Sequence, residues 1–259
     1  MPSSNQELKE HLDTSDAKTE VLLQKLIRFL DNGLEEILGS LDIGETQGLE
    51  SARILGSIFA ELEKKGLSGK LAEFKLLYAE ELRFLNKGLE AATPKDAKKV
   101  LGDADRVIVD ALIDNSFAKI ANKVTDYGLD IQSTVMQSVI TGQQPDYRAI
   151  KEDAGERLAG QIRTEVNTGL ATFNRTITAV KAQELGFELM IYLGPRDSLT
   201  RKFCKDLLLK DPPIYTIEEI KAMDNESDLS VLTSGGGYNC RHNWRPISIE
   251  RARERGYGG

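Results

Sequence analysis

Apolar residues recur every three or four positions through most of the first 130 residues, and this spacing places them on one face of a helix. Separate stripes of this kind cover residues 23–41, 54–62, 71–89 and 97–127. Glycine or proline follows several of the stripes, as expected where a helix ends. The sequence therefore predicts a first domain of packed helices, which we assign to residues 1–140.

The pattern changes after a polar segment, residues 141–149, which contains both glycine and proline and is predicted to be a linker. Beyond it, apolar spacing predicts a long amphipathic helix over residues 158–180 that Gly186 terminates. Residues 187–193 then alternate between apolar and other side chains, which predicts a strand with one buried face. Residues 150–259 are therefore predicted to form a second, smaller domain that contains a sheet.

Two shorter helices are expected in this second domain. Asp197 or Ser198 is predicted to cap a helix whose inner face carries Leu199. Thr216 with Glu219 has the spacing of a capping box, which predicts the start of another helix. The predicted class is α+β, predominantly α: a helical N-terminal domain followed by a small α+β C-terminal domain.

Composition limits the classes of protein. Hydrophobic residues make up 40 % of the 259 positions, which is sufficient for a sizeable core. No run approaches the roughly 18 apolar residues of a membrane helix, and the first residues lack the pattern of a signal peptide, so we expect a cytoplasmic protein without a membrane partner. The two cysteines exclude a disulfide scaffold, and a reducing compartment would keep both as thiols.

Charge is distributed unevenly along the chain. Residues 1–150 carry 18 Lys and Arg against 25 Asp and Glu, a net of −7, whereas residues 151–259 carry 16 of each. The acidic first part disfavours non-specific binding to nucleic acid. A local basic patch lies at the end, where residues 240–259 have a net charge of +3. Two interpretations of this patch stay open: a solvated helix with Glu and Arg pairs, or a DNA contact through Arg251, Arg253 and Arg255.

The strongest chemical candidates are Cys204, Cys240 and His242, because thiolate and imidazole are ligands that zinc prefers. A glycine turn before Cys240 can return the chain toward Cys204, and we expect the two sulfurs to lie within about 10 Å of each other. A structural zinc site needs a fourth ligand. Candidates for it are Asp197, Asp206, His11 and a water molecule. The competing interpretation is two half-buried thiols with His242 hydrogen-bonded inside the turn.

Charged residues form a second candidate group. Arg163 and Asp197 are predicted to belong to one buried or half-buried polar cluster with Arg241 or Arg201, because burying any of these charges alone would be costly. Paired hydrogen bonds between guanidinium and carboxylate fix geometry well. We favour an architectural role, since an enzyme would also present a positioned general base, and none is evident in the sequence.

Several short motifs in one order carry a family resemblance. Arg-Thr-Glu at 163–165 and Asn174 are followed by the Leu-Gly-Pro turn at 193–195 and, after it, by Gly-Gly-Tyr-Asn-Cys-Arg-His at 236–242. This pattern, over roughly residues 150–250, resembles the Mu F-like head morphogenesis proteins of tailed double-stranded DNA phages. Many relatives end in Asn-Cys-Arg-Cys where this chain has Asn-Cys-Arg-His. The positions that match the family motif are Arg163, Glu165, Asp197, Thr200, Arg201, Gly236, Asn239, Arg241 and Trp244.

The resemblance implies a non-enzymatic minor head protein, located in the virion head and, during assembly, in the host cytoplasm. It implies the portal protein or the major capsid protein as partners and, in some members, double-stranded DNA during packaging or ejection. No cofactor is expected other than the candidate zinc ion, and self-association stays open. The alternatives are a metal- or thiol-dependent enzyme that uses Cys204, Cys240 and His242, or a small DNA-binding module.

Overall fold

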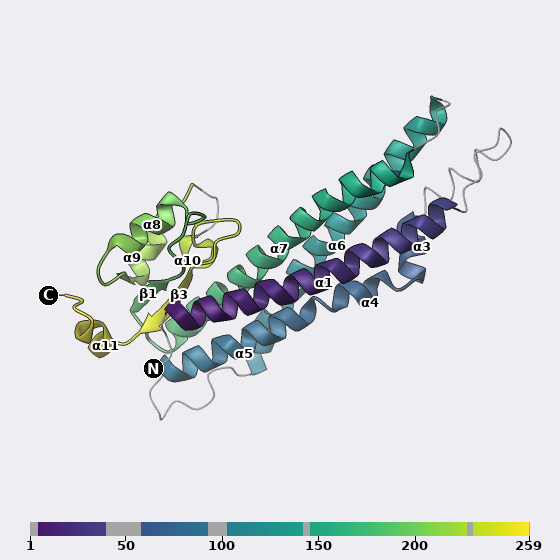
Figure 1. Cartoon of the computed structure of the whole chain (residues 1–259). Coiled ribbons are helices and arrows are strands. Elements are labelled where there is room, and N and C mark those ends of the chain that lie inside the picture. Colours follow the sequence, from purple (N-terminus) through teal and green to yellow (C-terminus); the bar gives the residue numbers. More distant parts are fainter. Residues whose placement is uncertain (1–4, 40–57, 93–102, 142–145, 227–229, 259) are drawn as a thin grey trace. The chain divides into compact units, whose positions relative to one another are not determined.

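The computed structural model describes residues 5–39, 58–92, 103–141, 146–226 and 230–258. The predicted class is confirmed, because the described residues are predominantly helical and contain one small antiparallel sheet. Among these residues, no helix is both long enough and apolar enough to span a bilayer. Figure 1 shows the elements and their labels.

The chain forms two compact units. The sheet-containing unit comprises Met1–Ala17, Leu77–Asp114 and Val166–Gly259, and the helical unit comprises Lys18–Leu76 and Asn115–Glu165. The long helices α1 (Asn5–Gly39), α5 (Lys75–Ala92), α6 (Asp103–Ile140) and α7 (Tyr147–Glu184) contribute residues to both. These units are discontinuous in sequence. The division into independently folding domains 1–140 and 150–259 stays a prediction.

In the helical unit, most described residues of the predicted stripes are buried. In α6, Val107 and Ile108 of the stripe over 97–127 are 72 % and 37 % exposed, which corrects that part of the prediction. The shorter helices of the helical unit are α3 (Ile58–Lys64) and α4 (Leu67–Ala72), and the apolar face of each helix is buried. The core of this unit contains Leu23, Leu26, Leu30, Leu34, Ile58, Leu62, Leu71, Phe74, Ile120, Val124, Tyr127, Ile131, Leu158 and Ile162. Parts of the predicted stripes, namely residues 40–41, 54–57 and 97–102, and residues 142–145 of the predicted linker lie outside the described residues.

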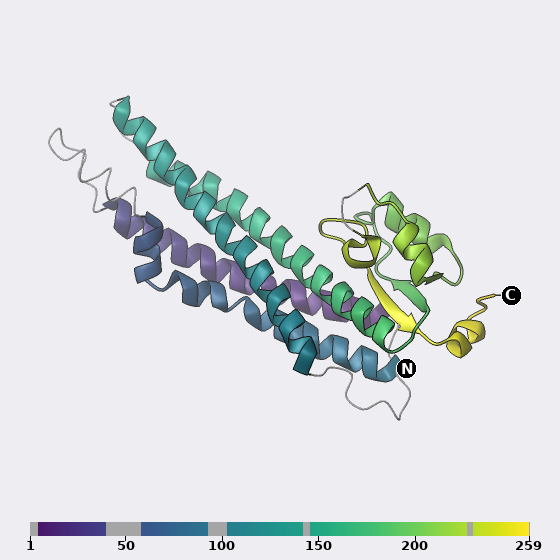
Figure 2. The same ribbon diagram turned by 180° about the vertical axis from the view of Figure 1, so that it is seen from behind.

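The sheet has three antiparallel strands in the order β2-β1-β3. Strand β1 (Leu189–Leu193) pairs on one side with β2 (Ile214–Thr216) and on the other with β3 (Asn243–Ile247). The yellow strand β3 lies beside the green β1 in both views (Figure 1 and Figure 2). One pair of the register is important for the site: Tyr192 on β1 lies opposite Trp244 on β3.

Strand β1 is buried on both faces, which corrects the prediction of one buried face. Met190 and Tyr192 face a core shared with α8 (Lys202–Leu209), α9 (Ile217–Ala222) and α10 (Val231–Ser234). Leu189, Ile191 and Leu193 face a second core. This second core is covered by residues of α1, α5 and α11 (Ile249–Glu254) that lie far away in the sequence. The alternating pattern therefore did not predict that both faces of this strand are buried.

The predicted helix boundaries around the sheet are partly confirmed. Helix α7 ends before Gly186, whose φ of 71° is the left-handed conformation that glycine adopts easily. Thr216 and Glu219 form the predicted capping box at the start of α9. The predicted cap of α8 is wrong, because this helix begins at Lys202 without a side-chain cap. Leu199 lies in the preceding loop and is 77 % exposed.

Candidate metal centre

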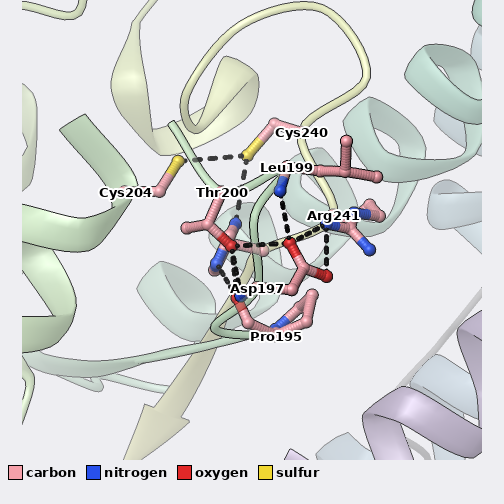
Figure 3. A network of polar contacts seen from close by, with 8 residues as sticks. Pro195, Asp197, Leu199, Thr200, Cys204, Cys240 and Arg241 are labelled. Carbon is pink, nitrogen blue, oxygen red and sulfur yellow. Dashed lines mark hydrogen bonds and ion pairs between the residues drawn. The ribbon is translucent and has the colours of Figure 1, made fainter. Parts of the chain in front are cut away.

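Two cysteine sulfurs and one histidine nitrogen converge inside the sheet-containing unit. Cys204 lies on α8, whereas Cys240 and His242 come from the segment between α10 and β3. The Sγ atoms of the two cysteines are 3.8 Å apart, and Cys240 Sγ is 3.8 Å from His242 Nδ1. The three ligand atoms lie within 4.8 Å of one another, and all three residues are buried. The predicted proximity of the thiols is confirmed, and Figure 3 shows their sulfur atoms facing each other.

These separations suit a tetrahedral metal ion. Bonds of about 2.3 Å to sulfur and 2.0 Å to nitrogen place two thiolates about 3.8 Å apart and a thiolate about 3.5 Å from an imidazole nitrogen. The observed separations are 3.8 Å in both cases. Both cysteines are free thiols. The group could therefore hold a metal ion without a large rearrangement of its side chains.

The orientation of His242 leaves one ring nitrogen available as a ligand. Its Nε2 lies 2.9 Å from the carbonyl oxygen of Pro195, which can only accept a hydrogen bond. Nε2 therefore carries the proton, and Nδ1 directs its lone pair toward Cys240. A hydrogen bond from the remote nitrogen to a carbonyl is the usual way in which proteins orient a metal-binding histidine. Gly194 is required beside this ring, since an added Cβ would lie 2.1 Å from His242 Cδ2.

The glycine turn is required by close packing around the sulfurs. An added Cβ on Gly236 would lie 2.4 Å from Cys204 Sγ and 3.4 Å from Cys240 Sγ. The backbone N–H of Gly236 donates a hydrogen bond to Cys240 Sγ at 3.2 Å. Gly235 has a φ of 59°, and a side chain there would contact the guanidinium of Arg175. The glycines predicted a turn at this place, and the neighbouring side chains fix its shape.

Arg175 on α7 holds the ligand segment in place and was not identified from the sequence. Its side chain is only 1 % exposed. Its guanidinium donates hydrogen bonds to the carbonyl oxygens of Cys240 at 2.6 Å, His242 at 2.9 Å and Thr233 at 3.2 Å. One buried side chain thus satisfies three backbone acceptors on the two sides of the glycine turn. Its charge also lies close to the sulfurs.

The two thiols have opposite electrostatic tendencies. A hydrogen bond from Cys204 lowers the pKa of Cys240, and the charge of Arg175 lowers it further, against the effect of burial. The same bond between the sulfurs, together with burial, raises the pKa of Cys204. Both shifts favour the arrangement in which the Cys204 thiol donates and Cys240 is the thiolate. A thiolate is the form of cysteine that binds metal ions.

Asp197 and Arg241 form the predicted ion pair beside this group. Arg241 Nη2 donates to both carboxylate oxygens of Asp197, at 2.7 and 2.8 Å. Asp197 Oδ1 also accepts from the backbone N–H of Leu199 and from the hydroxyl of Thr200. These contacts close the loop before α8, as Figure 3 shows, and they explain why Asp197 does not cap the helix.

Arg163 does not share this carboxylate. It donates three hydrogen bonds to Glu20 on α1, the shortest at 2.9 Å, inside the helical unit. The prediction that Arg163 and Asp197 belong to one cluster is therefore corrected, because the carboxylate partner of Arg163 is Glu20. Glu165 lies near Arg163 in the sequence on α7 and is half-buried. The sequence pattern alone could not show whether Arg163 pairs with Asp197 or with Glu20.

Other residues of the family motif make backbone contacts near the glycine turn. Arg201 donates to the carbonyl oxygen of Gly236 at 2.8 Å. Asn239, whose φ is 54°, donates its backbone N–H to the hydroxyl of Thr168 on α7 at 3.0 Å. Both contacts fix the turn from outside, whereas Arg175 fixes it from inside.

The C-terminal arginines do not all face solvent. Arg241 pairs with Asp197, and Arg245 stacks on the ring of Phe84 with its guanidinium carbon 4.7 Å from the ring centre. Arg251 is half-buried on α11, and Arg253 and Arg255 are exposed on α11 and just after it. The basic patch that the sequence predicted is thus smaller on the surface than its composition indicates.

Replacing Asp197 by Asn should destabilise this region in a pH-dependent way. The hydrogen bond from Arg241 lowers the pKa of Asp197 to about 2. Because this value lies below that of an unfolded aspartate, about 3.9, the pair stabilises above pH 4 and loses its effect as pH falls toward 2. The Asp197 side chain is 39 % exposed, so we expect Asp197→Asn to cost about 1 kcal/mol or less at neutral pH.

Urea denaturation followed by fluorescence of Trp244, the single tryptophan of the sequence, measures this difference. Asp206→Asn is the control, since Asp206 lies 3.9 Å from Lys202 in an exposed pair. A difference between wild type and Asp197→Asn that stays the same from pH 7 to pH 2 would contradict the assignment.

Comparison of the chain with protein-family models, with curated proteins and with solved structures found no significant match.

Proposed function

We propose that this chain is a non-enzymatic minor head protein of a tailed double-stranded DNA phage, with a zinc ion held by Cys204, Cys240 and His242. It acts in head morphogenesis with the portal protein or the major capsid protein as partner. Its locations are the host cytoplasm during assembly and then the virion head. The resemblance in the sequence pattern suggests this class, and the contacts of the motif residues support it.

The observation that carries the proposal is the structural use of the motif residues between α7 and β3. Asp197 pairs with Arg241, Arg201 holds the backbone of Gly236, and the indole of Trp244 donates to the carbonyl oxygen of Val231 at 3.2 Å. Trp244 is fully buried between Tyr192 and Tyr215. Their polar atoms are thus engaged in holding one fold together, which is the use expected of residues that build a scaffold.

Zinc fits the donor set better than magnesium or calcium does. Two thiolates and an imidazole exclude magnesium and calcium, which prefer oxygen ligands. A zinc ion at this place would connect α8 to the segment before β3 and so close the small fold at its least regular part. Small folds often gain their stability from a metal ion in this way.

Partner contacts are assigned to residues 1–140. This part carries the net acidity of the chain, and long amphipathic helices are a common means of docking. Residues 1–17 and 77–114, however, belong to the same compact unit as the sheet. Deleting residues 1–140 would therefore remove part of that unit, so the intact chain is the suitable material for a test of function.

Gradient sedimentation of lysates tests the proposal in cells that assemble heads of the phage encoding this chain. We expect the chain to sediment with the portal protein in procapsids that lack DNA. When the portal gene is deleted, the chain should lose that fraction or be reduced in it. A chain that stays with free proteins while heads assemble normally would refute the proposal.

A thiol-dependent enzyme is the second candidate, and the lowered pKa of Cys240 beside His242 is the observation that favours it. Burial of both residues argues against it, because a substrate would have to open the fold to reach the sulfur. A folded His242→Ala protein distinguishes the two. If it enters heads normally but the particles are not infectious, a chemical role becomes the better explanation.

A further inference from the structure

We propose that the phenolic oxygen of Tyr192 is the fourth ligand of the metal ion. The proposal rests on the zinc site proposed above and completes it, since structural zinc sites are almost always four-coordinate. Cys204, Cys240 and His242 would provide three ligands, and the tyrosine oxygen lies within 3.8 Å of both sulfurs.

The distances of the hydroxyl from the two sulfurs support this position. Tyr192 Oη lies 3.3 Å from Cys204 Sγ and 3.8 Å from Cys240 Sγ. Metal bonds of about 2.3 Å to sulfur and 2.0 Å to oxygen would place these atoms about 3.5 Å apart at a tetrahedral angle. The oxygen is therefore within a few tenths of an ångström of a ligand position with respect to both cysteines.

The packing of the ring keeps the hydroxyl at that place. Tyr192 is 0 % exposed at the fourth position of the central strand β1. Its ring is stacked on that of His242, with centroids 5.2 Å apart and planes inclined by 12°, and it also packs against Trp244, its partner in the sheet register. The phenol and the imidazole thus lie parallel and both direct a heteroatom toward the sulfurs.

The other candidates for the fourth ligand are engaged elsewhere. Asp197 is held by Arg241 and Thr200. His11 Nε2 pairs with a carboxylate oxygen of Glu81 at 2.7 Å. Asp206 points to Lys202 in an exposed pair. Among the described residues, the group of His, Cys and carboxylate side chains suited to a metal contains only the three ligands already named, which leaves the phenol beside them.

The chemistry requires one change at the hydroxyl. In the metal-free protein, Tyr192 donates its hydrogen to Cys204 Sγ, so the hydroxyl proton points toward the sulfurs. When the metal binds, the remaining proton of the cysteine pair is released to solvent, so that both cysteines bind as thiolates. The hydrogen bond from Tyr192 to Cys204 Sγ is given up, and a lone pair of the neutral phenol oxygen is directed to the ion. Because the site is buried, the phenol also occupies the position that a water molecule would otherwise need.

Zinc titration of the full chain, labelled with ¹³C at the Cζ atoms of tyrosine, tests this proposal by NMR. The chain has 7 tyrosines, and Tyr192→Phe identifies the resonance of Tyr192. Tyr215→Phe is the matched control: Tyr215 is also buried, packs on the same Trp244, and donates its hydroxyl to the carbonyl oxygen of Leu207 at 2.7 Å, away from the sulfurs.

We expect one equivalent of zinc to move the Tyr192 resonance more than any other tyrosine signal. Tyr192→Phe should weaken zinc binding by about tenfold or more, while Tyr215→Phe should change it by no more than about twofold. If zinc binds but the Tyr192 signal does not move, the tyrosine proposal is overturned and the three-residue zinc site stands. If wild type binds no zinc, the zinc site itself is refuted. The wild-type spectrum decides the matter even if Tyr192→Phe fails to fold.

Discussion

Replacing Arg175 by Met should lower the free energy of unfolding of the sheet-containing unit by about 3 to 5 kcal/mol, the largest effect we expect from a single substitution. The methionine side chain fills much of the same space but leaves the carbonyl oxygens of Cys240, His242 and Thr233 without their donor. A buried acceptor that loses its partner costs about 1 to 3 kcal/mol. Domains of this size are stable by only about 5 to 15 kcal/mol, so the fold would become marginal.

Trp244 provides the measurement, because the only tryptophan of the sequence lies in the core beside this site. Its fluorescence should show a large shift of the urea midpoint in Arg175→Met. Arg148→Met is the matched control on the same helix, since the Arg148 side chain is 87 % exposed and pairs with Glu152. Equal midpoints for the two variants would show that Arg175 does not hold the ligand segment.

Much of the fold could be predicted from local sequence signals. The three-four spacing of apolar residues predicted the helices, because a helix that buries one face must repeat in this way. The capping box at Thr216 and the glycine end at Gly186 are equally local, since each depends on the conformation of a few neighbouring residues. These features need no information about distant parts of the chain.

The errors arose where distant segments decide the outcome. The face of β1 that carries Met190 and Tyr192 is covered by α8, α9 and α10, which follow later in the chain, so alternation alone predicted an exposed face. Asp197 was expected to cap a helix, but its carboxylate is taken by Arg241. The local preference of aspartate for a helix cap is overridden here by an ion pair that forms only in the folded chain.

The candidate site divides in the same way. The residue types and the glycine turn predicted that Cys204, Cys240 and His242 would meet, and the sulfurs are 3.8 Å apart. Arg175 gave no signal, because a single arginine on a helix is usually a surface residue. Tyr192 was counted among the side chains on the exposed face of a strand. Its role depends on α8 and the ligand segment covering that face.

Removal of zinc should have the second largest effect. If free zinc is first held at roughly a thousand times its dissociation constant, removing it should lower the free energy of unfolding by about 4 kcal/mol. The ion binds the folded arrangement of Cys204, Cys240 and His242, which the unfolded chain cannot maintain, so binding energy becomes folding energy. We therefore expect a strong chelator to lower the urea midpoint reported by Trp244 fluorescence.

Single substitutions separate this effect from a general action of the chelator. Cys240→Ser and His242→Ala should unfold at the same urea concentration with and without chelator, because the site is already incomplete. His11→Ala should remain as sensitive as wild type, since the other histidine of the chain pairs with Glu81 and is not a ligand. Elemental analysis of the purified wild-type protein should give one zinc per chain. A wild-type protein that contains no metal and whose midpoint the chelator does not move would refute the zinc site, leaving two packed cysteine side chains.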